Sequence, residues 1–305
     1  MKNYKIILLS FIMAPILIFS QNKAKDSIVD KPQRPAFESS SIVDNQTNVL
    51  FSKNTLEVMM QHRFGSINGE NTLLGIYGPS NIRIGLSYSI LDWVTVGYGI
   101  TKRNITSDFS VKVGLLNQTR SGSMPLSLTY FGNVAIDGRS TDYSSYDSDN
   151  LPPPDVDAGL FLTKQDRYSY FHQLIIAKRF NPKLSLQLAP SLTHYNAVNY
   201  GGENDRFAIA FGGRYKISDQ TSFIFDYSQP ITQFNDKVEA DGSITSYNNA
   251  GISLGAEFST SAHAFQIFIT NLDGIVPQLN NMKNTNKFSN DGILIGFNIT
   301  RRYNF

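Results

Sequence analysis

The chain ends in the segment GILIGFNITRRYNF, residues 292–305, and this segment decides the fold class. In an extended strand, successive side chains point to opposite faces. One face is apolar (Ile293, Ile295, Phe297, Ile299, Tyr303 and Phe305) and the other is polar (Asn298, Thr300, Arg302 and Asn304), with Arg301 as the one break. An apolar face long enough to cross hydrocarbon, followed by a C-terminal aromatic ring, is typical of the closing strand and assembly signal of an outer-membrane β-barrel.

The same alternation recurs along most of the chain that precedes this segment. It is clearest at residues 82–90, where Ile, Ile, Leu, Tyr and Ile alternate with Arg, Gly, Ser and Ser. Counting each such run as one strand gives about twelve strands, an even number as in single-chain outer-membrane barrels.

The connections between these runs alternate in length. Short turns near residues 91, 117–123, 181, 218 and 259 are interleaved with longer loops near 65–80, 102, 137–166, 196–204, 231–248 and 272–290. Membrane barrels place short turns on one side of the bilayer and long loops on the other. We therefore predict an all-β fold, a single antiparallel up-and-down transmembrane β-barrel over residues 54–305. A secreted soluble β protein is the alternative.

Two segments precede the predicted barrel. In residues 1–20, Lys2 and Lys5 come before an apolar run at 6–19 that is shorter than the roughly 20 residues of a spanning helix. This pattern predicts a cleaved signal peptide, with a transmembrane anchor as the alternative. Residues 21–53 are polar and carry two X-Pro pairs and a run of three serines at 39–41. We expect a flexible arm on the periplasmic side, either free or tucked into the barrel.

The composition excludes several classes of function. The chain holds 27 Lys and Arg against 25 Asp and Glu, so removing Lys2 and Lys5 with the leader leaves 25 of each sign. This balance lacks the basic surface that nucleic acids require, and no nucleic-acid partner is expected. The absence of cysteine from the sequence excludes disulfides, thiol catalysis and lipid attachment through a cysteine.

Charged side chains on the polar strand faces should point into the lumen. They are Glu57, Arg63, Arg83, Lys112, Arg214, Lys216, Asp226, Glu257 and Arg302. Two interpretations remain open: they line a narrow pore that selects solutes by charge, or they pair with each other and with the arm and hold the wall together. About twelve strands lie between filled eight-stranded barrels and open sixteen-stranded porins, so strand number does not decide. Because the charge is mixed, we favour a narrow or plugged pore without a strong filter.

His172 and His194 are the candidates for catalysis. A hairpin that reverses at Pro182 pairs residues whose numbers sum to about 364, which places residue 172 opposite 192 and residue 194 opposite 170. The two rings would then be diagonal neighbours, an arrangement that would suit a lipid or peptide hydrolase. Such an enzyme also needs a nucleophile and an oxyanion donor, but Ser191 lies on the opposite strand face from His194. A belt of His and Tyr at the membrane interface is the simpler interpretation, and we expect no enzyme.

Acidic residues crowd the long loop after residue 137 and suggest a calcium site. They are Asp142, Asp147, Asp149, Asp155 and Asp157. The run at 147–150 begins like a calcium loop but lacks the Gly and the terminal Glu that complete it. A solvated acidic loop is the simpler interpretation, so neither a metal nor a cofactor is expected.

Several spaced stretches resemble a family of outer-membrane β-barrel proteins known only as a domain of unknown function. They are Arg34-Pro35-Ala36-Phe37-Glu38 with Asn45-Gln46-Thr47, His62-Arg63-Phe64-Gly65, Ser80-Asn81-Ile82-Arg83-Ile84-Gly85, residues 118–123, Phe265-Gln266-Ile267 with Thr270-Asn271, and Ile295-Gly296-Phe297-Asn298-Ile299-Thr300-Arg301. The resemblance implies an outer-membrane barrel and brings no established activity or catalytic residues. Ala262-His263-Ala264 departs from the Gly-His pair expected at that turn.

The sequence thus predicts a porin-like protein in the outer membrane of a Gram-negative bacterium, without catalysis. It would act as a small-solute channel or as a partner-binding wall protein. The expected partners are outer-membrane lipid, small solutes, and the barrel-assembly machinery, which would bind the C-terminal strand ending in Phe305.

Overall fold

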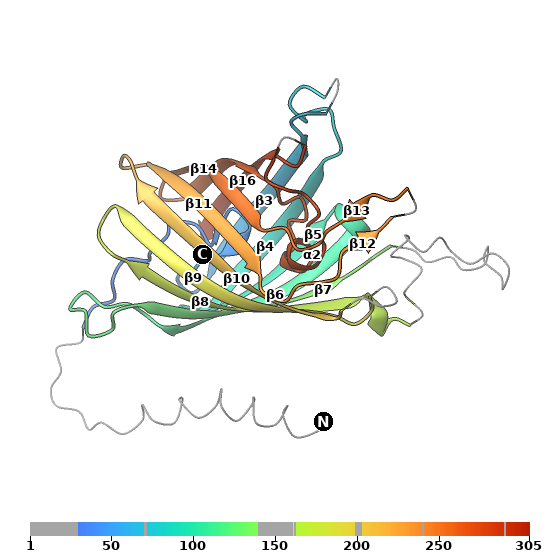
Figure 1. Cartoon of the computed structure of the whole chain (residues 1–305). Helices are drawn as coiled ribbons and strands as arrows, with labels where there is room; N and C mark the ends of the chain where they lie inside the picture. The colour runs from blue at the N-terminus through green and yellow to red at the C-terminus, as the bar shows by residue number, and fades with distance from the viewer. Residues whose placement is uncertain are drawn as a thin grey trace.

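The computed structural model describes residues 30–69, 72–139, 161, 163–198, 203–239, 241–289 and 291–305. Within these residues, twelve antiparallel strands form one closed barrel (Figure 1). The strands are β3 (Thr55–Ser66), β4 (Asn81–Leu91), β5 (Val94–Thr101), β6 (Thr106–Leu116), β7 (Ser127–Ile136), β8 (Tyr168–Arg179), β9 (Leu184–Tyr195), β10 (Asp205–Lys216), β11 (Thr221–Pro230), β14 (Gly251–Ser259), β15 (His263–Thr270) and β16 (Leu294–Asn304). The predicted fold class is confirmed.

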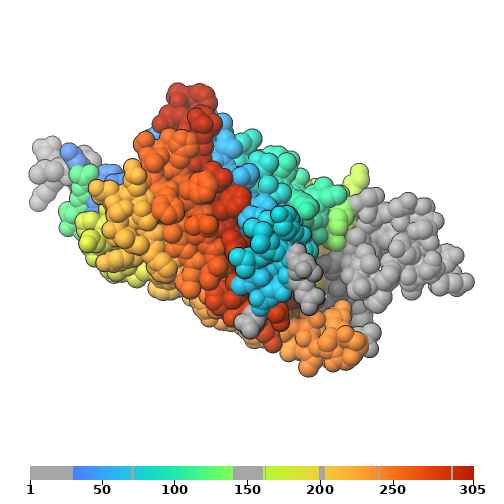
Figure 2. Space-filling model, turned by 90° about the horizontal axis from the view of Figure 1, so that it is seen from above, coloured from blue at the N-terminus to red at the C-terminus, as the bar shows by residue number. Residues whose placement is uncertain are grey.

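The C-terminal strand closes the barrel. β16 pairs antiparallel with β3, so that Phe297 lies opposite His62 and Tyr303 opposite Leu56. Figure 2 shows the red C-terminal segment directly against the blue and cyan segments that begin the barrel. The first and last strands therefore share one seam, which leaves the wall without a free edge.

The alternating pattern places apolar side chains outside and polar side chains inside. Leu86, Ile100 and Phe223 are 46%, 49% and 42% exposed, whereas Arg63 and Arg214 are buried within the barrel. Lipid requires this arrangement because the hydrocarbon core does not solvate charge. No helix among the described residues is long and apolar enough to cross a membrane.

The connections follow the predicted alternation with one correction. The long loop predicted near residue 102 is wrong: β5 and β6 are joined by residues 102–105, which include the short 3-10 helix η3 (Arg103–Ile105). The chain reverses tightly there because Asn104 and Ile105 have positive φ values of 58° and 49°. The predicted signal peptide and the five loop aspartates from Asp142 to Asp157 lie outside the described residues.

Two other connections carry short elements of their own. The segment between β11 and β14 holds a small hairpin of β12 (Lys237–Val238) and β13 (Ile244–Thr245). The segment between β15 and β16 holds the helix α2 (Pro277–Lys283). A further 3-10 turn, η6 (Gln165–Arg167), precedes β8.

The buried core of the molecule lies inside the barrel. The N-terminal arm forms a hairpin of β1 (Ser41–Ile42) and β2 (Asn45–Gln46), and its apolar residues are buried together with wall residues of several strands. In Figure 1 this blue segment lies within the ring of strands, and α2 lies inside near the opposite mouth. The lumen is therefore occupied from both ends.

The outward faces predict a specific sensitivity to charge. Leu86 lies in the middle of β4, opposite Val58 and Tyr98, so Leu86→Arg should lower the free energy of unfolding in lipid vesicles by about 2–4 kcal/mol. Leu74→Arg is the matched control, because Leu74 is 58% exposed on the loop between β3 and β4. Urea titration should show little change for the control. Equal effects for the two variants would contradict the assignment of the lipid-facing surface.

Candidate functional site: the occupied lumen

The arm enters the barrel at the mouth that carries the short turns. The backbone N–H of Gln33 donates to the carbonyl of Gln118 at 2.7 Å, and the Asp30 carboxylate accepts hydrogen bonds from the hydroxyls of Ser121 and Ser123. These hydrogen bonds lower the pKa of Asp30 to about 2, because they favour its charged form. The carboxylate stays charged at neutral pH, so this entrance does not act as a switch near physiological pH.

Two serines of the arm bind charged residues of the wall. Ser39 Oγ donates to Glu257 at 2.7 Å, and Ser40 Oγ donates to Glu57 at 2.7 Å. Lys112 Nζ donates to the carbonyl oxygen of Ser40 at 2.8 Å. All of these groups are buried, so the arm replaces the water that would otherwise solvate the wall charges.

Arg214 connects the arm to a second wall carboxylate. Its guanidinium lies 3.5 Å from Glu38 of the arm and 3.3 Å from Glu257 of β14. Arg214 and Glu257 are almost fully buried. The Arg214 guanidinium thus interacts with one carboxylate of the arm and one carboxylate of the wall.

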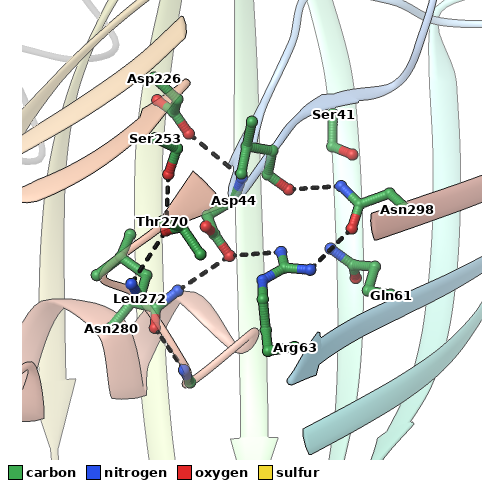
Figure 3. Close-up of polar contacts among 12 residues, drawn as sticks. Ser41, Asp44, Gln61, Arg63, Asp226, Ser253, Thr270, Leu272, Asn280 and Asn298 are labelled. Atoms are coloured by element: carbon green, nitrogen blue, oxygen red, sulfur yellow. Dashed lines mark hydrogen bonds and ion pairs between the residues drawn. The ribbon is translucent and has the colours of Figure 1, made fainter. Parts of the chain in front are cut away.

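The tip of the arm hairpin is held by charged residues on two sides (Figure 3). Arg63 Nη2 of β3 pairs with Asp44 Oδ1 at 2.9 Å, and both side chains are buried. On the other side, the Asp226 carboxylate of β11 accepts from the backbone N–H groups of Asp44 and Asn45, at 3.2 and 3.1 Å. A buried ion pair of this kind is costly to break, because either charge alone would be left unsolvated.

The turn residue Val43 is held in an unusual conformation. Its φ is 51°, which is rare for a β-branched residue. Its N–H donates to Gln266 at 3.3 Å, and its carbonyl accepts from Asn298 at 2.8 Å. Asn298 also accepts from Arg63 at 3.0 Å. The hydrogen bonds of the wall therefore fix the backbone of the turn as well as its charge.

Apolar contacts complete the binding site of the arm in the lumen, which we call its seat. Phe37, Ile42, Val43 and Val49 are each less than 5% exposed. They belong to one buried cluster with wall residues that face inward: Phe131, Phe171, Ile175, Ala177, Ala189, Ala210, Ile224 and Phe268. The lumen of this barrel is therefore partly apolar, and the arm covers the apolar part.

The helix α2 closes the lumen from the opposite mouth. Gln278 is fully buried and donates to Asn133 of β7 at 2.7 Å, and Asn281 donates to Thr193 of β9 at 3.0 Å. Asn280 Nδ2 lies 3.4 Å from Asp44 Oδ1, so the helix meets the tip of the arm (Figure 3). The two inserted segments contact each other at the Asp44 carboxylate.

A third buried arginine, Arg206, anchors α2. Arg206 of β10 donates through Nη1 to the carbonyl oxygens of Asn281 and Tyr247, at 2.7 and 2.6 Å. Its guanidinium lies 3.5 Å from the ring centroid of Phe234. Arg206 thus binds the helix and the loop between β11 and β14 at the same time.

The nine charged residues singled out from the sequence have different surroundings. Six contact polar groups of the arm: Glu57, Arg63, Lys112, Arg214, Asp226 and Glu257. Arg302 places its guanidinium 5.0 Å from the ring centroid of Phe51, at the base of the arm. Arg83 pairs instead with Asp108 of the wall, and Lys216 pairs with Asp219 at an exposed turn.

Sequence reasoning missed three charged residues of the lumen: Asp44, Asp108 and Arg206. Asp108 and Arg206 have the strand parity of Lys112 and Arg214, so the same face argument would have included them. It also missed the inward apolar residues, although apolar runs without alternation, such as 223–225 and 174–177, indicate strands with two apolar faces. Asp44 carried no such signal, because only the folded arm brings it to Arg63.

The register predicted around the turn at Pro182 is confirmed. His172 lies opposite Leu192, and His194 lies opposite Tyr170. The two rings have separate partners: His172 Nδ1 is 2.7 Å from the Tyr130 hydroxyl, and the other ring is bound by an acid of the neighbouring strand.

The surroundings of His194 differ from those of a hydrolase site. His194 Nδ1 is 2.7 Å from Asp205, on the outward face of the barrel. Ser191 is buried on the inward face, where its hydroxyl is 3.4 Å from the carbonyl of Ala208. For metals, the described part of the chain contains no group of three or more His, Cys, Asp or Glu side chains that could hold an ion.

These features define a closed β-barrel whose lumen is occupied by segments of its own chain. Residues 37–303 match the family described as a membrane-bound beta barrel domain, DUF5777, and the chain belongs to that family. None of the curated proteins matches the sequence.

Two solved structures illustrate the structural similarity. The COG4313 outer membrane channel from Pseudomonas putida F1 is 10% identical with a TM-score of 0.51, over 84% of this chain and 97% of that chain. The NanC porin is 8% identical with a TM-score of 0.47, over 82% of this chain and 100% of that chain. The first of these similarities shows a shared barrel fold.

The ion pair at the hairpin tip gives a test of how the arm is held. Asp44→Ala leaves Arg63 buried without its partner, a change that costs about 3–5 kcal/mol. Hydrogen exchange of the amides at 36–49 in detergent should accelerate by about 10²–10⁴-fold, because the arm opens more often. Arg34→Ala is the control, since its pair with Glu38 is solvent-exposed and worth at most about 1 kcal/mol.

The double variant Asp44→Ala/Arg63→Met refines the same experiment. It removes both charges and keeps an apolar side chain near Phe268, whose ring centroid lies 4.5 Å from the Arg63 guanidinium. Exchange should slow relative to Asp44→Ala. If Asp44→Ala exchanged at the wild-type rate, the ion pair would not hold the arm.

Proposed function

We propose that this protein is a small-solute channel of the outer membrane of a Gram-negative bacterium, held closed by its N-terminal arm and by α2, and without catalytic activity. The observation that carries the proposal is the seating of the arm: buried wall charges bind it from four directions, through Glu57 of β3, Lys112 of β6, Asp226 of β11 and Glu257 of β14.

The polar character of this seat favours a channel over a solid wall. A permanent core gains nothing from buried charges, which are often replaced by apolar residues without loss of stability. A lumen that fills with water when a plug moves needs charged and hydrogen-bonding side chains on its wall. When the arm withdraws, its contacts through Ser39, Ser40 and Asp44 are lost. The wall residues Glu257, Glu57 and Arg63 then become free to bind water.

Conductance in a planar bilayer tests the proposal. The wild-type protein should show no steps or rare steps, because both inserted segments occupy the lumen. Replacing residues 36–49 with a flexible Gly/Ser linker should give frequent, large steps, since this removes the side chains of the arm that contact the buried wall charges. Folding of each variant is checked by heat-modifiable migration in detergent.

Asp241→Asn provides the control for this measurement. Asp241 lies in the exposed turn of the β12–β13 hairpin, where it bonds to the backbone of Ser243, and the variant should behave as wild type. If the folded variant without the arm is silent, the channel is excluded and a partner-binding wall protein becomes the better explanation.

We further propose that the barrel-assembly machinery recognises the C-terminal strand. Phe305 is 80% exposed, and its N–H donates to the carbonyl of Asn54 at the barrel seam. The terminal ring is therefore accessible beside the two strands that have to join last. Lipid contact is supported by the apolar outer faces of the strands.

Substitution of the terminal ring tests this assembly signal. Phe305→Ala should reduce the amount of folded, heat-modifiable barrel in the outer-membrane fraction several-fold. Phe180→Ala is the control, because Phe180 is a 53% exposed ring at the turn between β8 and β9. Equal yields of both variants would exclude a role of Phe305 in assembly.

A further inference from the structure

The arm leaves space along one side of the lumen. Between the arm and strands β3–β6 lies a small cavity, with about 50 Å³ open to water-sized molecules. The wall side of this cavity consists mainly of small or charged residues: Gly85, Ser87, Thr95, Ser110, Lys112 and Glu57. Small side chains on three neighbouring strands make this side of the wall recede from the arm.

A second recess opens at the mouth that carries the long loops. It has about 40 Å³ open to water-sized molecules and is lined by Thr106 of β6, Ala135 of β7 and Gln278 of α2, among others. Thr106 and Ser110 belong to the same strand, so the two cavities lie along one wall, at different depths.

One polar cluster separates the two cavities. Arg83 of β4 makes two hydrogen bonds to the Asp108 carboxylate, at 2.9 and 2.7 Å. Asn133 of β7 donates to the same carboxylate at 3.0 Å, and Gln278 of α2 donates to Asn133 at 2.7 Å. Arg83 lines the cavity beside the arm, while Gln278 lines the recess at the mouth of the long loops.

The wall beside Arg83 is shaped to receive its side chain. A methyl group at Gly85 or Gly99 would overlap the guanidinium, so the glycines let the arginine lie flat against the wall. Arg83 also donates to Gln61 of β3 at 3.1 Å. Because Gln61 lies on the neighbouring strand, Arg83 keeps a partner when it turns away from Asp108.

We propose that the Arg83–Asp108 ion pair is a closed gate between the two cavities, and that breaking this pair opens a narrow route for small solutes along the β4–β6 wall while the arm stays in place. This inference rests on the proposed channel function and names the residues that select solutes in it. Either charge, freed from its partner, lies between the two cavities and selects solutes by the sign of their charge.

Single substitutions in the full-length chain test the gate. Asp108→Ala should give small steps in a planar bilayer, smaller than those of the variant that lacks residues 36–49, with selectivity for anions because Arg83 and Lys112 remain. Arg83→Ala should give steps selective for cations, because Asp108 and Glu57 remain. The two variants should therefore show reversal potentials of opposite sign in a KCl gradient.

Three further variants complete the experiment. Ser110→Phe, added to Asp108→Ala, fills the cavity beside the arm and should abolish the conductance steps. Lys216→Ala breaks the exposed pair with Asp219, away from the route, and should leave the wild-type behaviour unchanged. If an alanine variant does not reach the heat-modifiable form, Asp108→Asn or Arg83→Gln preserves the shape and should give the same sign of selectivity.

The outcomes separate the gate from the channel itself. If the variant without the arm conducts but the two gate variants are silent, or share one selectivity, the gate is wrong and the proposed function stands. If neither the gate variants nor the variant without the arm conduct, the proposed function fails, and the inference fails with it.

Discussion

Because lipid accepts only apolar side chains, the charged residues of the twelve strands have to face the lumen or lie near a mouth. This constraint creates the central problem of the fold. Arg63, Arg214 and Glu257 are almost completely shielded from water, and an isolated buried charge is far more costly than a buried apolar group. The arm solves this problem, since it brings hydroxyls, backbone groups and the Asp44 carboxylate to the charges that the exterior excludes.

The arm uses two kinds of contact, and they have different roles. The apolar contacts of Phe37, Ile42 and Val49 remove surface from water without fixing a direction. The polar contacts are directional, because the Ser39 and Ser40 hydroxyls have to meet Glu257 and Glu57 at hydrogen-bond distance. The apolar cluster therefore favours insertion of the arm, and the polar contacts determine where it stops.

The sequence was sufficient to predict the strands of the barrel wall, but not the contacts of the segments inside the lumen. Strand alternation predicts the barrel, its closure by β16 and the inward position of residues such as Glu57 and Arg214, because each rests on the period of two in a single strand. The seat of the arm depends on contacts between distant residues, such as Asp44 with Asp226, and no local pattern encodes them. Phe131 and Ile224 were missed for a related reason: an apolar lumen face makes sense only once the arm covers it.

The contact between the two inserted segments has a thermodynamic consequence. Asn280 of α2 and Arg63 of β3 bind the same oxygen of Asp44, so each segment stabilises the bound state of the other. Coupling of this kind is reciprocal: whatever loosens α2 weakens the seat of the arm by the same free energy with which loss of the arm weakens α2. Because the arm enters from the mouth of the short turns and α2 from the mouth of the long loops, the Asp44 carboxylate links events on the two sides of the membrane.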